Sequence, residues 1–307
     1  MSQDEYRSKI IKALAHAQED LQANPGRTVD QILENVNPRY GSVIGGETTC
    51  VQVEEAETIL ILDLGSGARN LGLEMEARKK QGQLKTKDFY VLLTHTHWDH
   101  IQGLPLFQPA FDPEVTLHFY SCLENCEERL IRQQHLDHSH ISFEDLPCKK
   151  AFHYVEPGGR FEIGPFQIST QSLIHPGGST SYKIEQGPRS FIFATDTEFY
   201  GPDLFNLIQE YHAFFNLADL MIMDAQYSLA EAEQKKGWGH TAMTIAVDCS
   251  IHWKIKQLVL THHEPAHTDD VIHELYLKAS SYVDAYAENE VSPIKVILAR
   301  EGDEYQL

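Results

Sequence analysis

The sequence predicts an α/β protein in which two mixed β-sheets carry helices on their outer faces. Short β-rich segments begin after residue 41, first in hairpins and later in alternation with helical segments. That order of elements is typical of mixed sheets covered by helices. The 307 residues suit one large domain or two small ones. Residues 41–307 contain no internal repeat and no low-complexity linker, so we predict a single domain there.

Residues 1–40 are predicted to form a helical extension of that domain. Asn24-Pro25-Gly26 ends a first helix over residues 3–22, and a second short helix is expected over 28–35. We expect the extension either to cover a domain or to pair two chains as a homodimer. Apolar residues recur on one face of the first helix, at the period of an amphipathic helix: Ile10, Ile11, Leu14 and Leu21.

The β-rich and helical segments follow one another along the rest of the chain. Gly164-Pro165 breaks one pair of β-rich runs into a hairpin. The predicted strands are 50–53, 58–62, 90–94, 115–120, 160–163, 166–173, 190–195, 220–223, 257–261 and 294–298. The predicted helices are 124–134, 203–215, 241–252 and 269–288.

The net charge of the protein limits the kinds of molecule that it is expected to bind. The formal net charge is −20, and a surface this acidic repels a long DNA or RNA molecule. The short run Arg78-Lys79-Lys80 is better explained as a solvated helix end than as a nucleic-acid patch. A small anionic substrate remains compatible with this charge, because bound metal ions can dominate the local field.

Cysteine usage and hydropathy predict a cytoplasmic protein. Residues 1–19 are polar and lack the apolar core of a signal peptide, and no apolar run is long enough to cross a bilayer. Five cysteines form no compact framework, which favours free thiols in a reducing compartment. Cys122 and Cys126 lie one helical turn apart, and we favour buried packing over a metal pair for them.

The strongest chemical signal lies in residues 94–100, which read Thr-His-Thr-His-Trp-Asp-His after an apolar strand. Alternate residues of an extended segment face the same way, so His95 and His97 project together. The chain then turns, and Asp99 and His100 can face the same space. Imidazoles and carboxylates are ligands that suit zinc, manganese or iron. These four residues therefore predict a metal site.

The motif His-x-His-x-Asp-His resembles the signature of the metallo-β-lactamase superfamily, and the resemblance spans about residues 41–307. It implies an αββα sandwich and two divalent metal ions, zinc by default, with manganese or iron accepting the same ligands. Three later residues at strand ends match the remaining ligand motifs: His175, Asp196 and His262. By this resemblance, His95, His97 and His175 hold one metal, Asp99, His100 and His262 hold the other, and Asp196 bridges them.

The resemblance also suggests residues around these ligands. We choose His262 over its neighbour His263 because Thr261-His262 matches the family's Thr-His. His263 and His267 then become candidates to support the ligands or touch substrate. Asp63 opens an Asp-x-Gly-x-Gly loop and is expected to orient a ligand histidine.

Two further features resemble a phosphodiesterase-like branch, which includes bacterial cyclic-nucleotide phosphodiesterases and the tRNA 3′-processing endonuclease. Residues 45–50 read Gly-Gly-Glu-Thr-Thr-Cys, close to that branch's Gly-Gly-Asn-Thr-Ser-Cys, with Glu47 in place of Asn. Asp224 and His240 match an acidic residue and a histidine that act on the scissile phosphate. The alternative is that His240 merely caps the helix expected from Thr241.

The expected activity is therefore hydrolysis of a phosphodiester by a hydroxide that bridges the metals. Asp99, His240 and Asp224 are the candidate catalytic residues, and His240 would protonate the leaving oxygen. The acidic surface, and the lack of an insertion resembling the tRNA-clamping arm, favour a small diester such as a cyclic nucleotide. Two alternatives remain: hydrolysis of an ester, lactone or thioester on the same metals, and a non-catalytic metal-containing sensor or binding module.

Residues 121–150 are a candidate entrance to the site. His135, His138 and His140 lie there with Phe143 and Leu146, and they could contact substrate or form a lid. Residues of this kind more often form a solvated loop.

Overall fold

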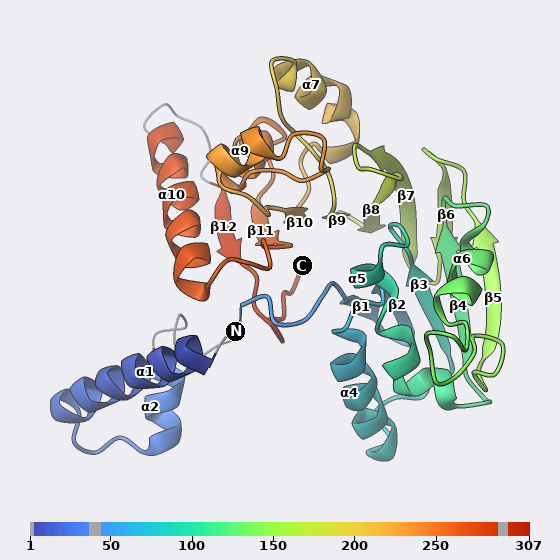
Figure 1. The fold of residues 1–307 in the computed structure, drawn as a ribbon, viewed down its shortest axis with the longest axis horizontal. Coiled ribbons are helices and arrows are strands. Elements are labelled where there is room, and N and C mark those ends of the chain that lie inside the picture. Colours follow the sequence, from blue (N-terminus) through green and yellow to red (C-terminus); the bar gives the residue numbers. More distant parts are fainter. Residues whose placement is uncertain (1–2, 37–43, 288–293) are drawn as a thin grey trace.

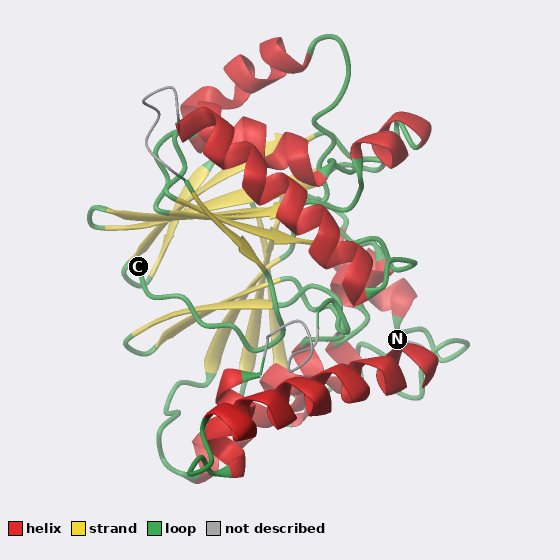
Figure 2. Ribbon diagram, turned by 90° about the vertical axis from the view of Figure 1, so that its left-hand side faces the viewer, coloured by secondary structure: helices red, strands yellow, loops and turns green. Residues whose placement is uncertain are grey.

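The structure is a computed structural model that describes residues 3–36, 44–287 and 294–307. Two β-sheets face each other between two layers of helices (Figure 2). Each sheet contains both parallel and antiparallel pairs, so the predicted αββα sandwich is confirmed. The predicted domain boundary between residues 40 and 41 lies outside the described residues, as does Glu288 at the predicted end of the last helix.

The first sheet has five strands in the order in which they occur along the chain. Its first two strands form an antiparallel hairpin, and each later pair is parallel. The strands are β1 (Val51–Glu55), β2 (Thr58–Leu62), β3 (Asp88–Leu92), β4 (Thr116–Ser121) and β5 (Lys149–Tyr154).

The second sheet has seven strands in the order β12-β11-β10-β9-β8-β7-β6. Strands β6 to β9 pair antiparallel, and β9 to β12 pair parallel. The strands are β6 (Arg160–Ile163), β7 (Phe166–Leu173), β8 (Ser179–Gln186), β9 (Arg189–Ala194), β10 (Leu220–Asp224), β11 (Gln257–Thr261) and β12 (Lys295–Leu298).

Helices cover both outer faces of the sandwich (Figure 1). On the first sheet they are α4 (Ala68–Lys80), α5 (Trp98–Ile101), α6 (Cys126–Gln133) and two 3₁₀ turns, Leu104–Leu106 and Gln108–Phe111. On the second sheet they are α7 (Leu204–Phe215), α8 (Leu229–Gln234), α9 (Met243–His252) and α10 (Asp269–Ala287). The N-terminal helices are α1 (Gln3–Ala23) and α2 (Val29–Asn35).

Three apolar clusters hold the layers together. The cluster between the sheets includes Leu62, Tyr182 and Phe193, which are fully buried. A second cluster joins the first sheet to α4 and α6, and a third joins the second sheet to α7 and α9. Burial of an aliphatic or aromatic side chain contributes about 1.5–3 kcal/mol, so these clusters fix the relative position of the two sheets.

The sequence did not predict strands β5 and β8, helix α4, the short helices α5 and α8, or the two 3₁₀ turns. Strand β5 is an edge strand with polar ends, and β8 begins with small hydroxyl residues, so neither shows a clear apolar alternation. Helix α4 is rich in charged residues and contains Gly72. A Cβ at Gly72 would lie 2.7 Å from the backbone nitrogen of Gln108, so close packing on the 3₁₀ turn explains this glycine.

The parallel register of the second sheet brings several strand ends together. Ala194 lies opposite Met223, and Asp224 lies opposite Thr261, so β9, β10 and β11 end at one level. The segment after β3 of the first sheet lies at the same edge. The backbone N–H of Thr180, in β8 of the second sheet, donates to the carbonyl of Thr94 in that segment at 3.1 Å. The carboxyl ends of strands from both sheets therefore surround one region.

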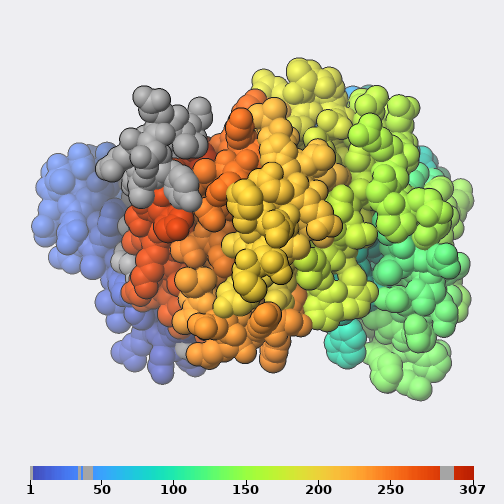
Figure 3. All heavy atoms as spheres, turned by 90° about the horizontal axis from the view of Figure 1, so that it is seen from above, coloured from blue at the N-terminus to red at the C-terminus, as the bar shows by residue number. Residues whose placement is uncertain are grey.

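Helices α1 and α2 form a hairpin beside α10, at one end of the molecule (Figure 3). Helix α1 buries none of its residues, and Lys12 forms a 2.8 Å ion pair with Asp270 of α10. Ile11 and Leu14 are 57% and 64% exposed, so pairing of two chains through this helix stays a prediction. Across the described residues, no helix is long and apolar enough to cross a membrane.

Candidate metal centre

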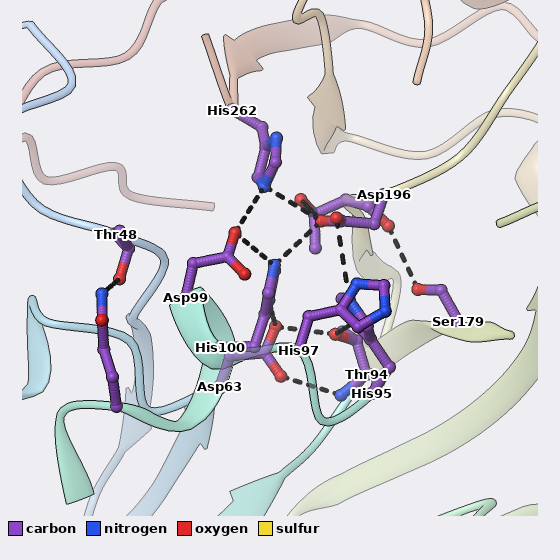
Figure 4. A network of polar contacts seen from close by, with 12 residues as sticks. Thr48, Asp63, Thr94, His95, His97, Asp99, His100, Ser179, Asp196 and His262 are labelled. Atoms are coloured by element: carbon purple, nitrogen blue, oxygen red, sulfur yellow. Dashed lines mark hydrogen bonds and ion pairs between the residues drawn. The ribbon is translucent and has the colours of Figure 1, made fainter. Parts of the chain in front are cut away.

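Three residues at the strand ends adopt left-handed backbone conformations. Asp63, Asp196 and His262 have φ of 60°, 57° and 58°. This region is unfavourable for residues other than glycine, at a cost on the order of 1–3 kcal/mol each, and strained residues of this kind cluster at functional sites. The turn redirects each chain segment as its strand ends, and all three side chains lie in the polar network between the sheets (Figure 4).

The first candidate ligand set surrounds one oxygen of Asp196. The Nε2 atoms of His95 and His175 lie 3.7 and 3.6 Å from Asp196 Oδ1. The Nδ1 atom of His97 lies 3.1 Å from His175 Nε2. One ligand atom from each of these four residues lies within 4.8 Å of those of the other three.

The second candidate set surrounds the other oxygen of Asp196. His100 Nε2 and His262 Nε2 lie 3.1 and 3.3 Å from Asp196 Oδ2. Asp99 Oδ2 lies 3.3 Å from His100 Nε2 and 3.2 Å from His262 Nε2. Figure 4 shows His100 and His262 pointing toward the two carboxylates. Because Asp196 turns one oxygen to each set, its carboxylate lies between them.

Neighbouring residues orient these histidines. The Nδ1–H of His100 donates to Asp63 Oδ2 at 2.7 Å, which leaves Nε2 facing Asp99 and Asp196. Asp63 also accepts hydrogen bonds from the backbone N–H and the hydroxyl of Thr94, both at 2.8 Å. The Thr94 hydroxyl in turn lies 2.9 Å from His95 Nδ1. A single buried carboxylate therefore fixes ring orientation in both sets.

Glycine is required beside Asp63. A Cβ at Gly65 would lie 2.3 Å from the carbonyl oxygen of Asp99 and 2.5 Å from that of Thr49. The Asp63 loop can approach the segment bearing Asp99 this closely only because residue 65 has no side chain.

The pKa shifts indicate a buried, neutral imidazole at His95 and a concentration of negative charge around His262. Burial lowers the pKa of His95 to about 2, so its ring is neutral at physiological pH, as a metal ligand must be. Burial also opposes protonation of His262, but the nearby carboxylates, led by Asp196, raise the pKa of that ring to about 9. The histidines around Asp196 hold the pKa of its carboxyl well below the usual range, although burial alone would raise it.

The donor set fits two divalent cations. The Nε2 atoms of His95 and His100 are buried without a hydrogen-bond partner, and a metal ion would satisfy both. Ligands bonded to zinc at about 2.0–2.1 Å lie roughly 3.3 Å apart in a tetrahedral shell. The 3.1–3.3 Å separations among Asp99, His100, Asp196 and His262 match that spacing.

Asp224 and His240 form a directly bonded pair beside the two sets. The Nδ1–H of His240 donates to Asp224 Oδ2 at 2.7 Å, and Asp224 is completely buried. The His240 ring lies 5.0 Å from that of His262 and 5.1 Å from that of His175. Helix α9 begins at Met243 after the N-cap residue Ala242, so His240 does not cap it and the predicted start at Thr241 is wrong by two residues.

Glu198 and Gly239 are site residues that the sequence did not suggest. The Nδ1–H of His175 donates to the Gly239 carbonyl at 2.9 Å. The carboxylate of Glu198 accepts the backbone N–H of Gly239 at 2.8 Å and that of Gly237 at 2.9 Å. Glu198 thus holds the loop that orients His175 and carries His240. The position of Glu198, two residues after Asp196, was the available signal.

The other residues suggested by the sequence lie around the centre without joining either set. His263 belongs to neither set, and burial lowers its pKa to about 4. His267 Nε2 lies 2.8 Å from Glu231 Oε1 at the start of α8. The Glu47 carboxylate accepts the hydroxyl of Ser66 at 2.5 Å, so it ties the Gly-Gly segment to the Asp63 loop.

The segment 121–150 is partly core and partly surface. Phe143 and Leu146 are buried in the cluster beneath the first sheet. His135 is exposed and pairs with Asp137 at 3.2 Å. Arg129 contacts the segment that bears the ligands, because its guanidinium donates to the hydroxyl of Thr96 at 3.1 Å.

Comparison with known proteins identifies a family model and relatives that this chain matches. Residues 65–263 match the model of the beta-lactamase superfamily domain, a range that contains every residue of both candidate sets. A ribonuclease Z of Prochlorococcus marinus (strain NATL1A) is 26% identical over 261 residues, covering 68% of this chain and 78% of the relative. YqgX of Bacillus subtilis (strain 168), a probable metallo-hydrolase, is 32% identical over 115 residues, covering 36% of this chain and 50% of the relative.

Solved structures share the fold at low sequence identity. YhfI, a metallo-beta-lactamase fold protein from Bacillus subtilis, gives a TM-score of 0.61 at 19% identity and covers 85% of this chain and 96% of its own. Unliganded yeast PDE1 gives 0.60 at 15% identity, covering 83% and 93%. The short form of human tRNase Z gives 0.55 at 18% identity, covering 82% and 90%.

The fold and site thus define an αββα sandwich protein with a candidate dinuclear histidine and aspartate centre at its strand ends. The chain belongs to the beta-lactamase superfamily. The likeness to ribonuclease Z agrees with the predicted resemblance to the phosphodiesterase-like branch, and the human tRNase Z and yeast PDE1 structures share the fold.

Proposed function

We propose that this protein is a phosphodiesterase that hydrolyses a small diester, such as a cyclic nucleotide, at a dinuclear metal centre. The Asp224–His240 pair carries this proposal, because it provides a proton donor beside both ligand sets. The proposal also draws support from relatives whose names include ribonuclease Z and from a fold shared with a diphosphatase of the PhnP family at a TM-score of 0.54.

The first chemical requirement is a nucleophile, and two divalent ions held by the sets around Asp196 would supply a hydroxide at neutral pH and neutralise charge on the phosphoryl oxygens. The chain's own contribution is to hold the ligands in place. Asp63 fixes His100 and, through Thr94, His95, and the Gly239 carbonyl fixes His175. Orientation set in advance costs no reorganisation during the reaction.

The second requirement is a proton for the leaving oxygen. Asp224 accepts the Nδ1–H of His240 and so fixes the ring, with Nε2 left to face the substrate. The Asp224 side chain is itself fixed, since its Oδ1 accepts the backbone N–H groups of Gln226 and Thr241, each at 3.2 Å. In its imidazolium form, which the Asp224 carboxylate stabilises, His240 carries a second proton on Nε2; it can donate this proton to the alkoxide as the phosphorus–oxygen bond breaks, and the ring is left neutral.

The size of the substrate is argued from charge. The formal net charge of −20 disfavours a long polyanion and leaves a small diester as the preferred substrate. Hydrolysis of an ester or lactone would use the metals without needing a proton from His240, so the role of this residue separates the two functions.

The test compares His240→Ala with a control, His252→Ala, which alters a half-buried histidine at the end of α9. Turnover of bis(4-nitrophenyl) phosphate, cyclic AMP, cyclic GMP and a lactone is measured on protein of known metal content. We expect His240→Ala to lower diester turnover by about 10²–10⁴-fold while metal content stays unchanged. Diester turnover near the wild-type rate in this variant, with the lactone as the better substrate, would overturn the proposal.

A further inference from the structure

Two of the three tryptophans are exposed, which is unusual for so large an apolar side chain. Trp98 and Trp238 are 77% and 62% exposed, whereas Trp253 is completely buried. Trp253 stacks on Phe215 with ring centroids 4.4 Å apart. Within the described part of the chain, no aromatic ring contacts either exposed indole. The ammonium of Lys235 lies over one side of the Trp238 ring, and both indoles keep exposed apolar surface available to a partner.

Both exposed tryptophans border the candidate metal centre. Trp98 lies between the ligand candidates His97 and Asp99. Trp238 precedes Gly239, whose carbonyl accepts the Nδ1–H of His175. His175 Nε2 is in turn 3.1 Å from His97 Nδ1. Each tryptophan is thus one residue away from a group that contacts His175.

The segments that carry these indoles are fixed in place. Glu198 accepts backbone N–H groups on both sides of Trp238, from Gly237 and Gly239. Gly239 has φ of +88°, and a Cβ there would lie 2.2 Å from His175 Nδ1, so this loop conformation requires glycine. Trp98 is the first residue of α5, whose next two residues belong to the second ligand set.

We propose that Trp98 and Trp238 form an aromatic rim that stacks on a planar ring of the substrate, as in a nucleobase, while its phosphate lies over the metals. This inference rests on the proposed phosphodiesterase function and names the recognition element of that site. Stacking of a base on an aromatic side chain is tolerant of sequence, because every base offers a π-face.

The charges near the rim favour a neutral ring over a cationic head group. The ammonium of Lys235 lies 5.7 Å from the centroid of the Trp238 ring. On the Trp98 side, the guanidinium of Arg129 donates to the hydroxyl of Thr96. Arg129 makes no ion pair with any carboxylate of the described segments. Lys235 is ion-paired with Glu264 at 2.5 Å, so the positive charge that a quaternary ammonium would meet, and a nucleobase would not, is mainly that of Arg129.

The test measures binding of three ligands to the metallated protein by quenching of tryptophan fluorescence. AMP and ribose 5-phosphate carry the same phosphate ester and differ by the base, and phosphocholine carries a cation instead. We expect AMP to quench the fluorescence and to bind at least about tenfold more tightly than ribose 5-phosphate. The double variant Trp98→Ala/Trp238→Ala should lose this preference and keep its metal content and its affinity for ribose 5-phosphate. Binding of AMP to this variant is followed calorimetrically.

Matched variants keep the test specific. Trp98→Phe/Trp238→Phe should restore the preference for AMP, because phenylalanine still stacks. Phe111→Ala, at an exposed aromatic residue of the 3₁₀ turn against α4, should leave it unchanged. An unaltered preference for AMP in the double alanine variant, or a preference for phosphocholine over AMP in the wild type, would overturn the aromatic rim. Neither result bears on diester turnover, which tests the proposed function separately.

Discussion

The two halves of the candidate metal centre place their ligands along the chain in different ways. The first sheet supplies four candidate ligands within residues 95–100, just after strand β3. The second sheet supplies His175, Asp196 and His262 from the ends of three separate strands. Local chain geometry therefore positions the ligands from the first sheet, and the strand register positions the ligands from the second sheet.

This difference predicts where the centre is most sensitive. A substitution in the first half should alter one ligand and leave the rest in place. The ligands from the second sheet depend on contacts between segments far apart in sequence. Substitutions there should therefore affect three things: the geometry of the ligands, the proton donor His240, and the loop that carries His240 and contacts His175.

The largest effect is expected at Asp196, the residue that links both sets. In Asp196→Asn the amide replaces the carboxylate oxygen that faces one set, and the positive charge of two cations loses its shared counterion. We expect metal content to fall in both sets and diester turnover to fall by more than about 100-fold. Metal analysis of the purified protein checks this, with the exposed Asp203→Asn as control. Two metals per chain in Asp196→Asn would show that this residue does not join the sets.

A smaller effect, confined to turnover, is expected at Asp224. In Asp224→Asn the side chain keeps its volume, but an amide N–H in place of Oδ2 cannot accept the proton on His240 Nδ1, so the ring loses its fixed tautomer. We expect at least about a tenfold loss of kcat with unchanged metal content. The measurement is diester kinetics on metal-loaded protein. Loss of metal from this variant would instead assign Asp224 to metal binding.

Substitution of Glu198 tests the loop that both orients the ligand His175 and carries the proton donor His240. Removing its carboxylate in Glu198→Ala frees two backbone N–H groups and releases Gly239 from His175. We expect about 10–100-fold weaker metal binding together with a lower kcat. Glu198→Gln retains one acceptor oxygen and should recover most of the metal affinity. Equal behaviour of the two variants in a competition titration with a chelating dye would contradict this role.

The smallest effect concerns the start of α8, which precedes the Trp238 loop. Ser228 and Glu231 form a capping box there, and Glu231 also binds His267. Burial alone would raise the pKa of Glu231, but its hydrogen bonds to Ser228 and His267 lower it to about 2, against 4.5 ordinarily. A depressed pKa stabilises the fold above about pH 4.5, and the contribution disappears as pH falls to about 2. Glu231→Gln should therefore unfold more readily than the wild type at pH 7 but not at pH 2, as measured by urea denaturation.

Much of the fold followed from the sequence because its strands show clear β-rich runs. Among the elements that the sequence did not predict, β5, β8 and α4 have polar or charged compositions, and contacts with their neighbours in the fold stabilise them. The resemblance chose His262 over His263, and the structure gives the geometric reason. The backbone of His262 adopts the left-handed conformation, which directs its ring toward Asp99 and Asp196. His263 belongs to neither ligand set.

The sequence by itself determined the local cluster at residues 95–100, because the spacing of side chains along a strand and a helix sets which of them project together. It also identified the Asp224–His240 pair by resemblance. Only the tertiary structure revealed that Glu198 and Gly239 orient His175, and that Trp98 and Trp238 are both exposed beside the centre. Those facts depend on how segments far apart in the chain meet, and the register of packed strands decides such contacts.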